Sequence, residues 1–118
     1  MSWKTGLRIS IFSVALSVAC AHTWPRPAML RGWVSDAACG ASHTDGRGAG
    51  CVRKCLRGGA SIGHPEWKAQ AMVFVVEPFK RLLIVDNPSK LQGSEGQHIS
   101  IMARERGGHL TVIRRDES

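Results

Sequence analysis

Residues 71–85 read AMVFVVEPFKRLLIV, and this stretch decides the fold. Residues 71–76 and residues 81–85 are two short apolar runs rich in valine, leucine and isoleucine, and residues 77–80 separate them. Short runs of this composition, bounded by turn residues, are typical of β-strands. Because a four-residue connection can join neighbouring antiparallel strands, the stretch predicts a β-hairpin.

Three further runs of the same kind lie on either side of this hairpin. They are residues 30–35, residues 98–102 and residues 109–113. The sequence RGG at residues 106–108 predicts a second hairpin between the last two runs. Five short strands with little helix indicate a mostly β fold, namely a small five-stranded OB-like barrel or a curved sheet with one short helix.

The remaining segments complete this single domain, which we assign to residues 30–118. Residues 51–57 contain helix-forming residues without glycine or proline and are followed by two glycines, so they predict one short helix. We expect this helix to cover one open end of the barrel. Residues 86–96 form a longer connection, from which we expect Leu91 to fill the core. We also expect Trp33 to lie in the core.

The most chemically specific segment is residues 32–60, GWVSDAACGASHTDGRGAGCVRKCLRGGA. It contains Cys39, His43, Cys51 and Cys55, and the last two share a face of the predicted helix because they are four residues apart. We expect Asp36 to cap a short turn that ends near Cys39. By contrast, the other histidines of the domain (His64, His98 and His109) are isolated in the sequence, and we expect them at the surface.

Three interpretations of the Cys/His cluster remain open. The first is a structural disulfide from Cys39 to Cys51 or to Cys55, which export would favour. A bridge from Cys51 to Cys55 fits less well, because positions four apart on a helix hold their Cβ atoms too far apart. Either pairing leaves one thiol over.

The second interpretation is a metal site that uses this remaining thiol. Cys39, His43, Cys51 and Cys55 form a Cys₃His set, and four such ligands are sufficient for tetrahedral zinc. Thiolates also suit copper as Cu(I). We therefore name these four residues as candidate metal ligands, with zinc or copper as the candidate ion.

The third interpretation is catalytic. A cysteine thiolate would act with His43 as the base, and Asp36 or Asp45 would orient the imidazole. The spacing matches no catalytic motif, so we assign no catalytic residue and expect that the protein is not an enzyme.

Residues 1–21 have the three parts of a secretory signal peptide. A basic start with Lys4 and Arg8 is followed by an apolar run, residues 9–19, that is too short to span a bilayer. The small residues on either side of Cys20 then form a cleavage site.

Lipid attachment at Cys20 is the competing prediction for this leader. Ser17 stands where a lipoprotein signal usually has a large aliphatic residue, so we favour cleavage after Ala21. We expect export to the periplasm or the extracellular space, with residues 22–29 as an extended leader and no transmembrane segment after cleavage.

The chain is basic. Its formal net charge is +7, and loss of Lys4 and Arg8 with residues 1–21 leaves +5. This charge suits either a solvated basic face or a partner such as an anionic envelope component. OB-like barrels also bind oligonucleotides through aromatic strand faces, but residues 22–118 contain few aromatic residues and no tyrosine, which argues against nucleic acid.

Three motifs carry a resemblance to known proteins: G-W-V-S-D-x-x-C-G at residues 32–40, then His43, then C-x-x-x-C at residues 51–55. With the strand residues that follow, the chain resembles a group of small exported bacterial proteins of unknown function that have a predicted OB-like β-barrel. The resemblance implies export and a barrel fold, and it implies no established reaction.

Together these features predict an exported, single-domain, non-enzymatic protein whose Cys/His cluster is a structural disulfide or a transition-metal site. Two alternatives are a binding module for an anionic envelope component and a thiol-dependent enzyme.

Overall fold

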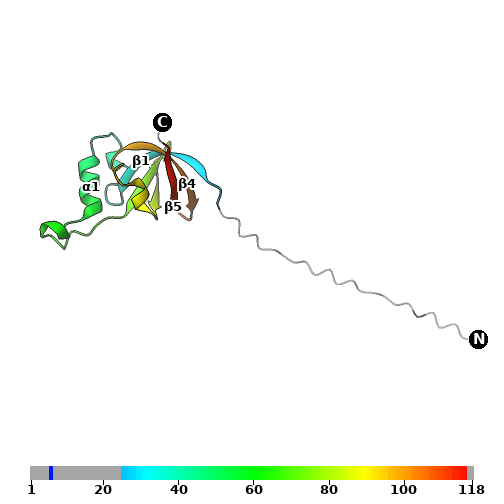
Figure 1. Cartoon of the computed structure of the whole chain (residues 1–118), viewed down its shortest axis with the longest axis horizontal. Coiled ribbons are helices and arrows are strands. Elements are labelled where there is room, and N and C mark those ends of the chain that lie inside the picture. The colour runs from blue at the N-terminus through cyan, green and yellow to red at the C-terminus, as the bar shows by residue number, and fades with distance from the viewer. Residues whose placement is uncertain (1–5, 7–24, 117–118) are drawn as a thin grey trace, which may run out of the picture.

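The structure is a computed structural model that describes residue 6 and residues 25–116 (Figure 1). The predicted signal peptide therefore lies outside the described residues, except for Gly6. The described part is mostly β, with the strands β1 (Ala28–Asp36), β2 (Met72–Val76), β3 (Arg81–Val85), β4 (His98–Arg106) and β5 (His109–Asp116). The helical elements are α1 (Ala49–Arg57) and the 3-10 turns η1 (Gly40–His43), η2 (Ala60–Ile62) and η3 (Pro88–Leu91).

The five strands form a closed barrel in the order β1-β2-β3-β5-β4, and β4 pairs with β1 to complete the ring. All neighbouring pairs are antiparallel except β3 and β5, which run parallel. The side chain of Asn87 extends this parallel pairing, because it donates to the carbonyl of Val112 at 2.8 Å and accepts from its N–H at 2.9 Å. Closing the ring leaves no long unpaired edge strand.

Both predicted hairpins are present. Residues 77–80 join β2 to β3, and Phe74 pairs with Leu83 across them. Gly107 and Gly108 join β4 to β5 with φ angles of 57° and 81°, values that a two-residue hairpin turn requires and that glycine adopts without strain.

The barrel interior is apolar and closely packed. Phe74, Leu83, Ile101 and Leu110 are each at most 1% exposed, and they belong to one cluster. Leu91, from η3, is fully buried in the same cluster, which confirms its predicted role. Burial of this kind is the main favourable contribution to the stability of a small domain.

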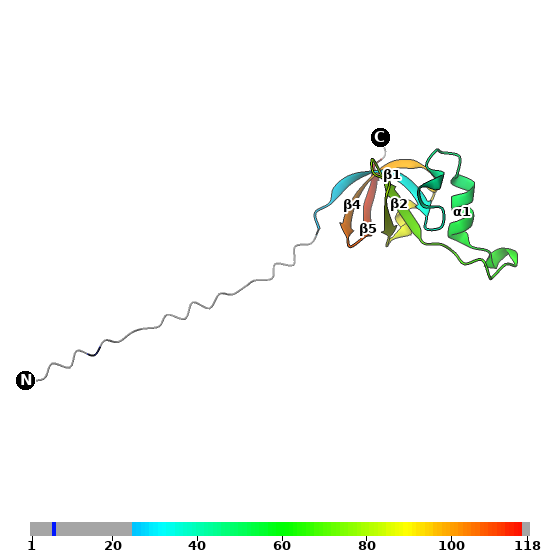
Figure 2. The same cartoon turned by 180° about the vertical axis from the view of Figure 1, so that it is seen from behind.

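A long segment between β1 and β2 lies outside this barrel. We call residues 37–71 the β1–β2 insertion; they include η1, α1 and η2. Figures 1 and 2 show α1 and the turn that follows it lying outside the ring of strands. Within α1, Val52 is fully buried and Leu56 packs against the barrel core.

Several sequence predictions need correction. β1 begins at Ala28, so the last two residues of the predicted leader, residues 28–29, belong to the barrel. They pair with Ala103 and Met102 of β4, a partner that the local sequence cannot indicate. β4 and β5 also extend beyond their apolar runs, and α1 begins two residues before the predicted helix.

Trp33 does not lie in the core. Successive residues of a strand face opposite sides, and Val34 points into the barrel. The half-buried Trp33 indole donates to Glu77 at 3.2 Å and packs edge-on against His98. Separately, the part of the chain that the structure describes contains no helix of the length and apolar character that crossing a membrane demands.

Candidate metal centre

The end of β1 positions the first cysteine of the cluster. Asp36, the last residue of β1, is fully buried. Its Oδ1 atom accepts hydrogen bonds from the backbone N–H groups of Ala38 at 3.0 Å and Cys39 at 2.9 Å, which confirms the predicted cap. Ser35, also buried, donates its hydroxyl to the carbonyl of Gly40 at 2.7 Å. These two side chains fix the turn that carries Cys39.

His43 is positioned by η1 and by a close contact with the start of α1. Thr44 donates to the carbonyl of Ala41 at 3.0 Å and closes the end of η1. Gly48 lies directly against the imidazole, because a Cβ atom at Gly48 would be 2.2 Å from the Cβ of His43. The absence of a side chain at Gly48 therefore leaves the space in which His43 sits.

Three of the four predicted ligands form one close group, and the fourth, Cys55, adjoins that group through Cys39. The Sγ atoms of Cys39 and Cys51 are 3.9 Å apart. Ligand atoms of Cys39, His43 and Cys51 lie within 4.8 Å of one another. A second group, Asp36, Cys39 and Cys55, satisfies the same limit. Cys39 belongs to both groups, so it is the centre of the cluster.

Asp36 is the member that sequence reasoning missed as a ligand. Its Oδ1 atom caps the turn, but its Oδ2 atom is buried without a hydrogen-bond partner among the described residues. A buried polar atom without a protein partner is unfavourable, and a bound cation is one group that would satisfy it. The sequence signal was available, since an acidic residue precedes Cys39 by only three positions, but the sequence pattern indicates Asp36 only as a cap or as a residue that orients His43.

The electrostatics of the cluster favour the protonated form of two of its thiols, those of Cys39 and Cys55. Burial raises the pKa of the Cys39 thiol to about 12, and the Cys51 thiol and the negative charge of Asp36 add to this shift. Burial, followed by the charge of Asp36, also raises the pKa of Cys55. A bound cation would reverse this balance, because metal ions bind thiolates and displace their protons.

No disulfide links the cysteines among the described residues: Cys39, Cys51 and Cys55 are all free thiols. Cys51 is exposed, whereas Cys39 and Cys55 are half-buried. The cluster is therefore open to solvent on the Cys51 side and buried on the Asp36 side.

The other histidines lie at the surface, as expected: His64 and His109 are exposed, and His98 is half-buried. Each pairs with an acidic side chain: His64 with Glu66 at 2.9 Å, His98 with Glu77 at 2.9 Å and His109 with Asp86 at 2.7 Å. Two of these pairs join residues more than 20 positions apart, so only the fold brings them together. None of the three histidines belongs to a metal-binding group among the described residues.

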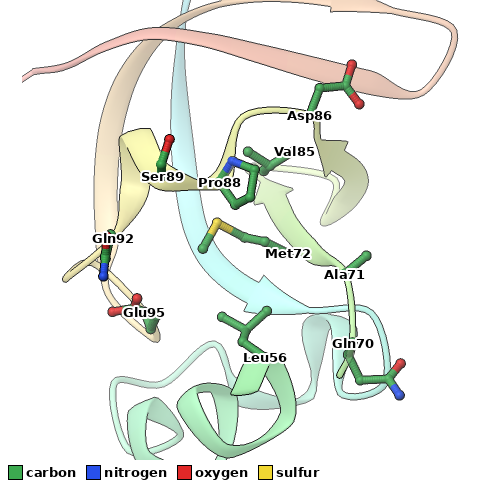
Figure 3. Close-up of a pocket in the computed structure, with 10 residues that line it drawn as sticks. All are labelled: Leu56, Gln70, Ala71, Met72, Val85, Asp86, Pro88, Ser89, Gln92 and Glu95. Atoms are coloured by element: carbon green, nitrogen blue, oxygen red, sulfur yellow. The ribbon is translucent and has the colours of Figure 1, made fainter. Parts of the chain in front are cut away.

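A pocket of about 560 Å³ lies between α1, the start of β2 and η3 (Figure 3). Leu56 of α1 points toward Met72 of β2, and together with Val85 and Pro88 they give the pocket an apolar lining. Its lining includes no cysteine and no histidine. The Cys/His cluster therefore does not open into this pocket.

Comparisons with protein-family models, curated proteins and solved structures found no match to this chain. The resemblance to small exported bacterial proteins consequently remains a prediction from the motif residues. The function has to be argued from the cluster itself.

Proposed function

We propose that this protein is an exported, single-domain, non-enzymatic metal-binding protein whose Cys/His cluster holds a zinc or copper(I) ion. One observation carries the proposal: the ligand atoms of Cys39, His43 and Cys51 lie within 4.8 Å of one another, with Cys55 and Asp36 adjoining through Cys39. Thiolates and imidazole are the ligands that zinc and copper(I) prefer. The leader at residues 1–21 supports export.

The buried carboxylate of Asp36 also supports the proposal. A bound cation would neutralise the carboxylate and give its Oδ2 atom, which lacks a hydrogen-bond partner, a favourable interaction. Cys39, His43 and Cys51 would hold the ion, and Cys55 or Asp36 would complete a tetrahedral set. The ion would cross-link the turn after β1, which carries Cys39, to η1 and α1, which carry His43 and Cys51.

The catalytic alternative is less well supported. A cysteine nucleophile has to be a thiolate near neutral pH, which requires a lowered pKa. The pKa of Cys39 is instead raised to about 12 by burial and by its neighbours.

The direct test is a titration of the reduced, purified protein with zinc and with copper(I) against competing chromophoric chelators. We expect one tightly bound ion per chain and release of protons on binding, so that the apparent affinity falls as the pH is lowered. Cys39→Ser and Cys51→Ser should abolish tight binding. His64→Ala changes a histidine outside the cluster and serves as the control.

Gly48 offers a sharper test that changes no ligand residue. Gly48→Ala inserts a Cβ atom into the space of the His43 side chain and should displace the imidazole, weakening binding by roughly tenfold or more. Gly50→Ala is the matched control, because a Cβ atom at Gly50 would meet nothing within 4 Å.

Mass spectrometry distinguishes the competing interpretations. A mass lower by two hydrogens without bound metal would show a disulfide and would contradict the metal proposal; Cys39 and Cys51, whose Sγ atoms are 3.9 Å apart, are one candidate pair. A single thiol that reacts rapidly near neutral pH, again without metal, would favour the catalytic alternative.

A further inference from the structure

A second pocket, of about 580 Å³, lies on the side of α1 where the helix meets the loop that follows it, residues 58–71. Lys54 and Arg57 of α1 and Ile62, Trp67 and Lys68 of the loop line it. Figures 1 and 2 show that this loop extends away from the barrel. A pocket of this volume is large enough for one small organic molecule.

The loop that forms the pocket is held in place by backbone hydrogen bonds. Gly59 donates to the carbonyl of Trp67 at 2.9 Å, His64 donates to the carbonyl of Gly59 at 2.8 Å, and Gln70 donates to the carbonyl of Cys55 at 2.8 Å. The backbone at Gly59 lies so close to the backbone at His64 that a Cβ atom at Gly59 would be 2.4 Å from the carbonyl oxygen of His64. The pocket wall is therefore preformed.

Two large apolar side chains are exposed on this fixed loop. Ile62 is 63% exposed and Trp67 is 54% exposed. The imidazole of His64 stacks on the indole of Trp67 at 3.9 Å, and Glu66 holds His64 at 2.9 Å. His64 covers one face of the Trp67 indole. Trp67 lines the pocket and His64 does not. A fixed, exposed aromatic surface beside a pocket is typical of a binding site.

The charges around the pocket have one sign. Lys54, Arg57 and Lys68 line it, and its lining contains no acidic residue. Among the residues that the structure describes, none of the three forms an ion pair. The pocket thus combines an apolar wall with cations that have no acidic partner there, which is complementary to an anion with an apolar body.

We propose that this pocket binds a small organic anion with a flat apolar body, namely an aromatic carboxylate. The ring packs against Trp67 and Ile62, and the carboxylate is held by Arg57 with Lys54 and Lys68 nearby. The basic charge of the chain suits an anionic partner, and this pocket is where such a ligand would bind. None of these five residues is a candidate metal ligand, although Cys55, which is one, also lines the pocket.

The test is isothermal titration calorimetry of the purified protein with 1-naphthoate. We expect saturable binding of one molecule per chain. Arg57→Gln should weaken it by roughly tenfold, the effect of losing one charge-assisted hydrogen bond pair. Arg53→Gln is the matched control: Arg53 lies on the same helix and is exposed, but it does not line the pocket.

The aromatic contact is tested separately. Trp67→Ala should weaken binding by roughly tenfold, whereas Trp67→Phe, which keeps a flat ring, should retain most of it. Circular dichroism and amide exchange of the loop check that the variants keep the fold. These outcomes, together with weak binding of the uncharged 1-naphthalenemethanol, support the proposal.

Three results would overturn it. The first is no saturable binding of 1-naphthoate at millimolar concentration. The second is an equal loss in Arg53→Gln and Arg57→Gln, which would show only general attraction to a basic surface. The third is equal affinity for the alcohol and the carboxylate, which would show an apolar contact without recognition of charge.

Discussion

The barrel and the β1–β2 insertion are stabilised in different ways. The barrel encloses a continuous apolar cluster that includes Phe74, Leu83 and Ile101. Within residues 37–71, all of which the structure describes, Val52 is the only buried apolar side chain. The insertion is held instead by the cap from Asp36, by close contacts at glycines and by neighbouring thiols. A segment with so little core gains most from a metal or a cross-link.

The largest expected effect tests the barrel side of this comparison. Phe74→Ala should lower the free energy of unfolding by about 4 kcal/mol, because it removes a fully buried ring and leaves a cavity. Val52→Ala in the insertion should lower the free energy of unfolding by only about 2 kcal/mol. Urea unfolding measures both. Phe79→Ala is the control, since Phe79 is 91% exposed and its loss should change stability by about 0.5 kcal/mol or less.

Metal loading tests the insertion side. When free zinc is about 100 times its dissociation constant, opening of the insertion should become about 100-fold rarer, equivalent to about 2.7 kcal/mol. Hydrogen exchange should therefore slow across α1, while the amides of β2 and β3 change much less. Equal slowing in α1 and the barrel strands would mean that the two regions open as one unit, and the comparison would fail.

Alkaline pH should lower the free energy of unfolding of the metal-free, reduced protein because of the Cys39 thiol. The pKa of this thiol is about 12 in the folded protein, against an ordinary value of 9.0, so the folded state binds the proton more tightly. The contribution to stability is complete below pH 9 and is lost as the pH rises from 9 to 12. Cys39→Ser lacks this titration. Unfolding curves that depend on pH in the same way for both proteins would show that Cys39 does not contribute.

The smallest effect is expected at the exposed rim of the barrel. The hydrogen bond from His98, followed by the one from Trp33, lowers the pKa of Glu77 below its ordinary value of 4.5. Its stabilising contribution is therefore present above pH 4.5 and is lost as the pH falls through the lowered value. Glu77→Gln should be slightly less stable than the unchanged protein at pH 7 and equally stable in acid. A difference that persists in acid would point to lost packing instead.

Much of the barrel was predictable because its information is local. The runs of valine, leucine and isoleucine at residues 71–85 predicted β2, β3 and their hairpin, and Leu91 was correctly placed in the core. The position of Trp33 was not predictable in this way. Whether Trp33 or Val34 faces inward depends on which side of β1 meets the other strands.

The candidate site was predictable in its residues and not in its arrangement. The spacing of Cys39, His43, Cys51 and Cys55 singled them out. The spacing did not show that Cys39 lies at the centre, or that a buried oxygen of Asp36 adjoins it without a partner. These facts depend on how the end of β1 and the start of α1 pack together.

The sequence by itself determined the class of fold, the strand-forming segments and the identity of the candidate ligands, because composition and short-range spacing encode all three. Only the tertiary structure decided the closure of β1 against β4 and the pairing of His98 and His109 with distant acids. Each of these joins residues that are far apart in the chain, and such contacts are set by the packing of whole elements.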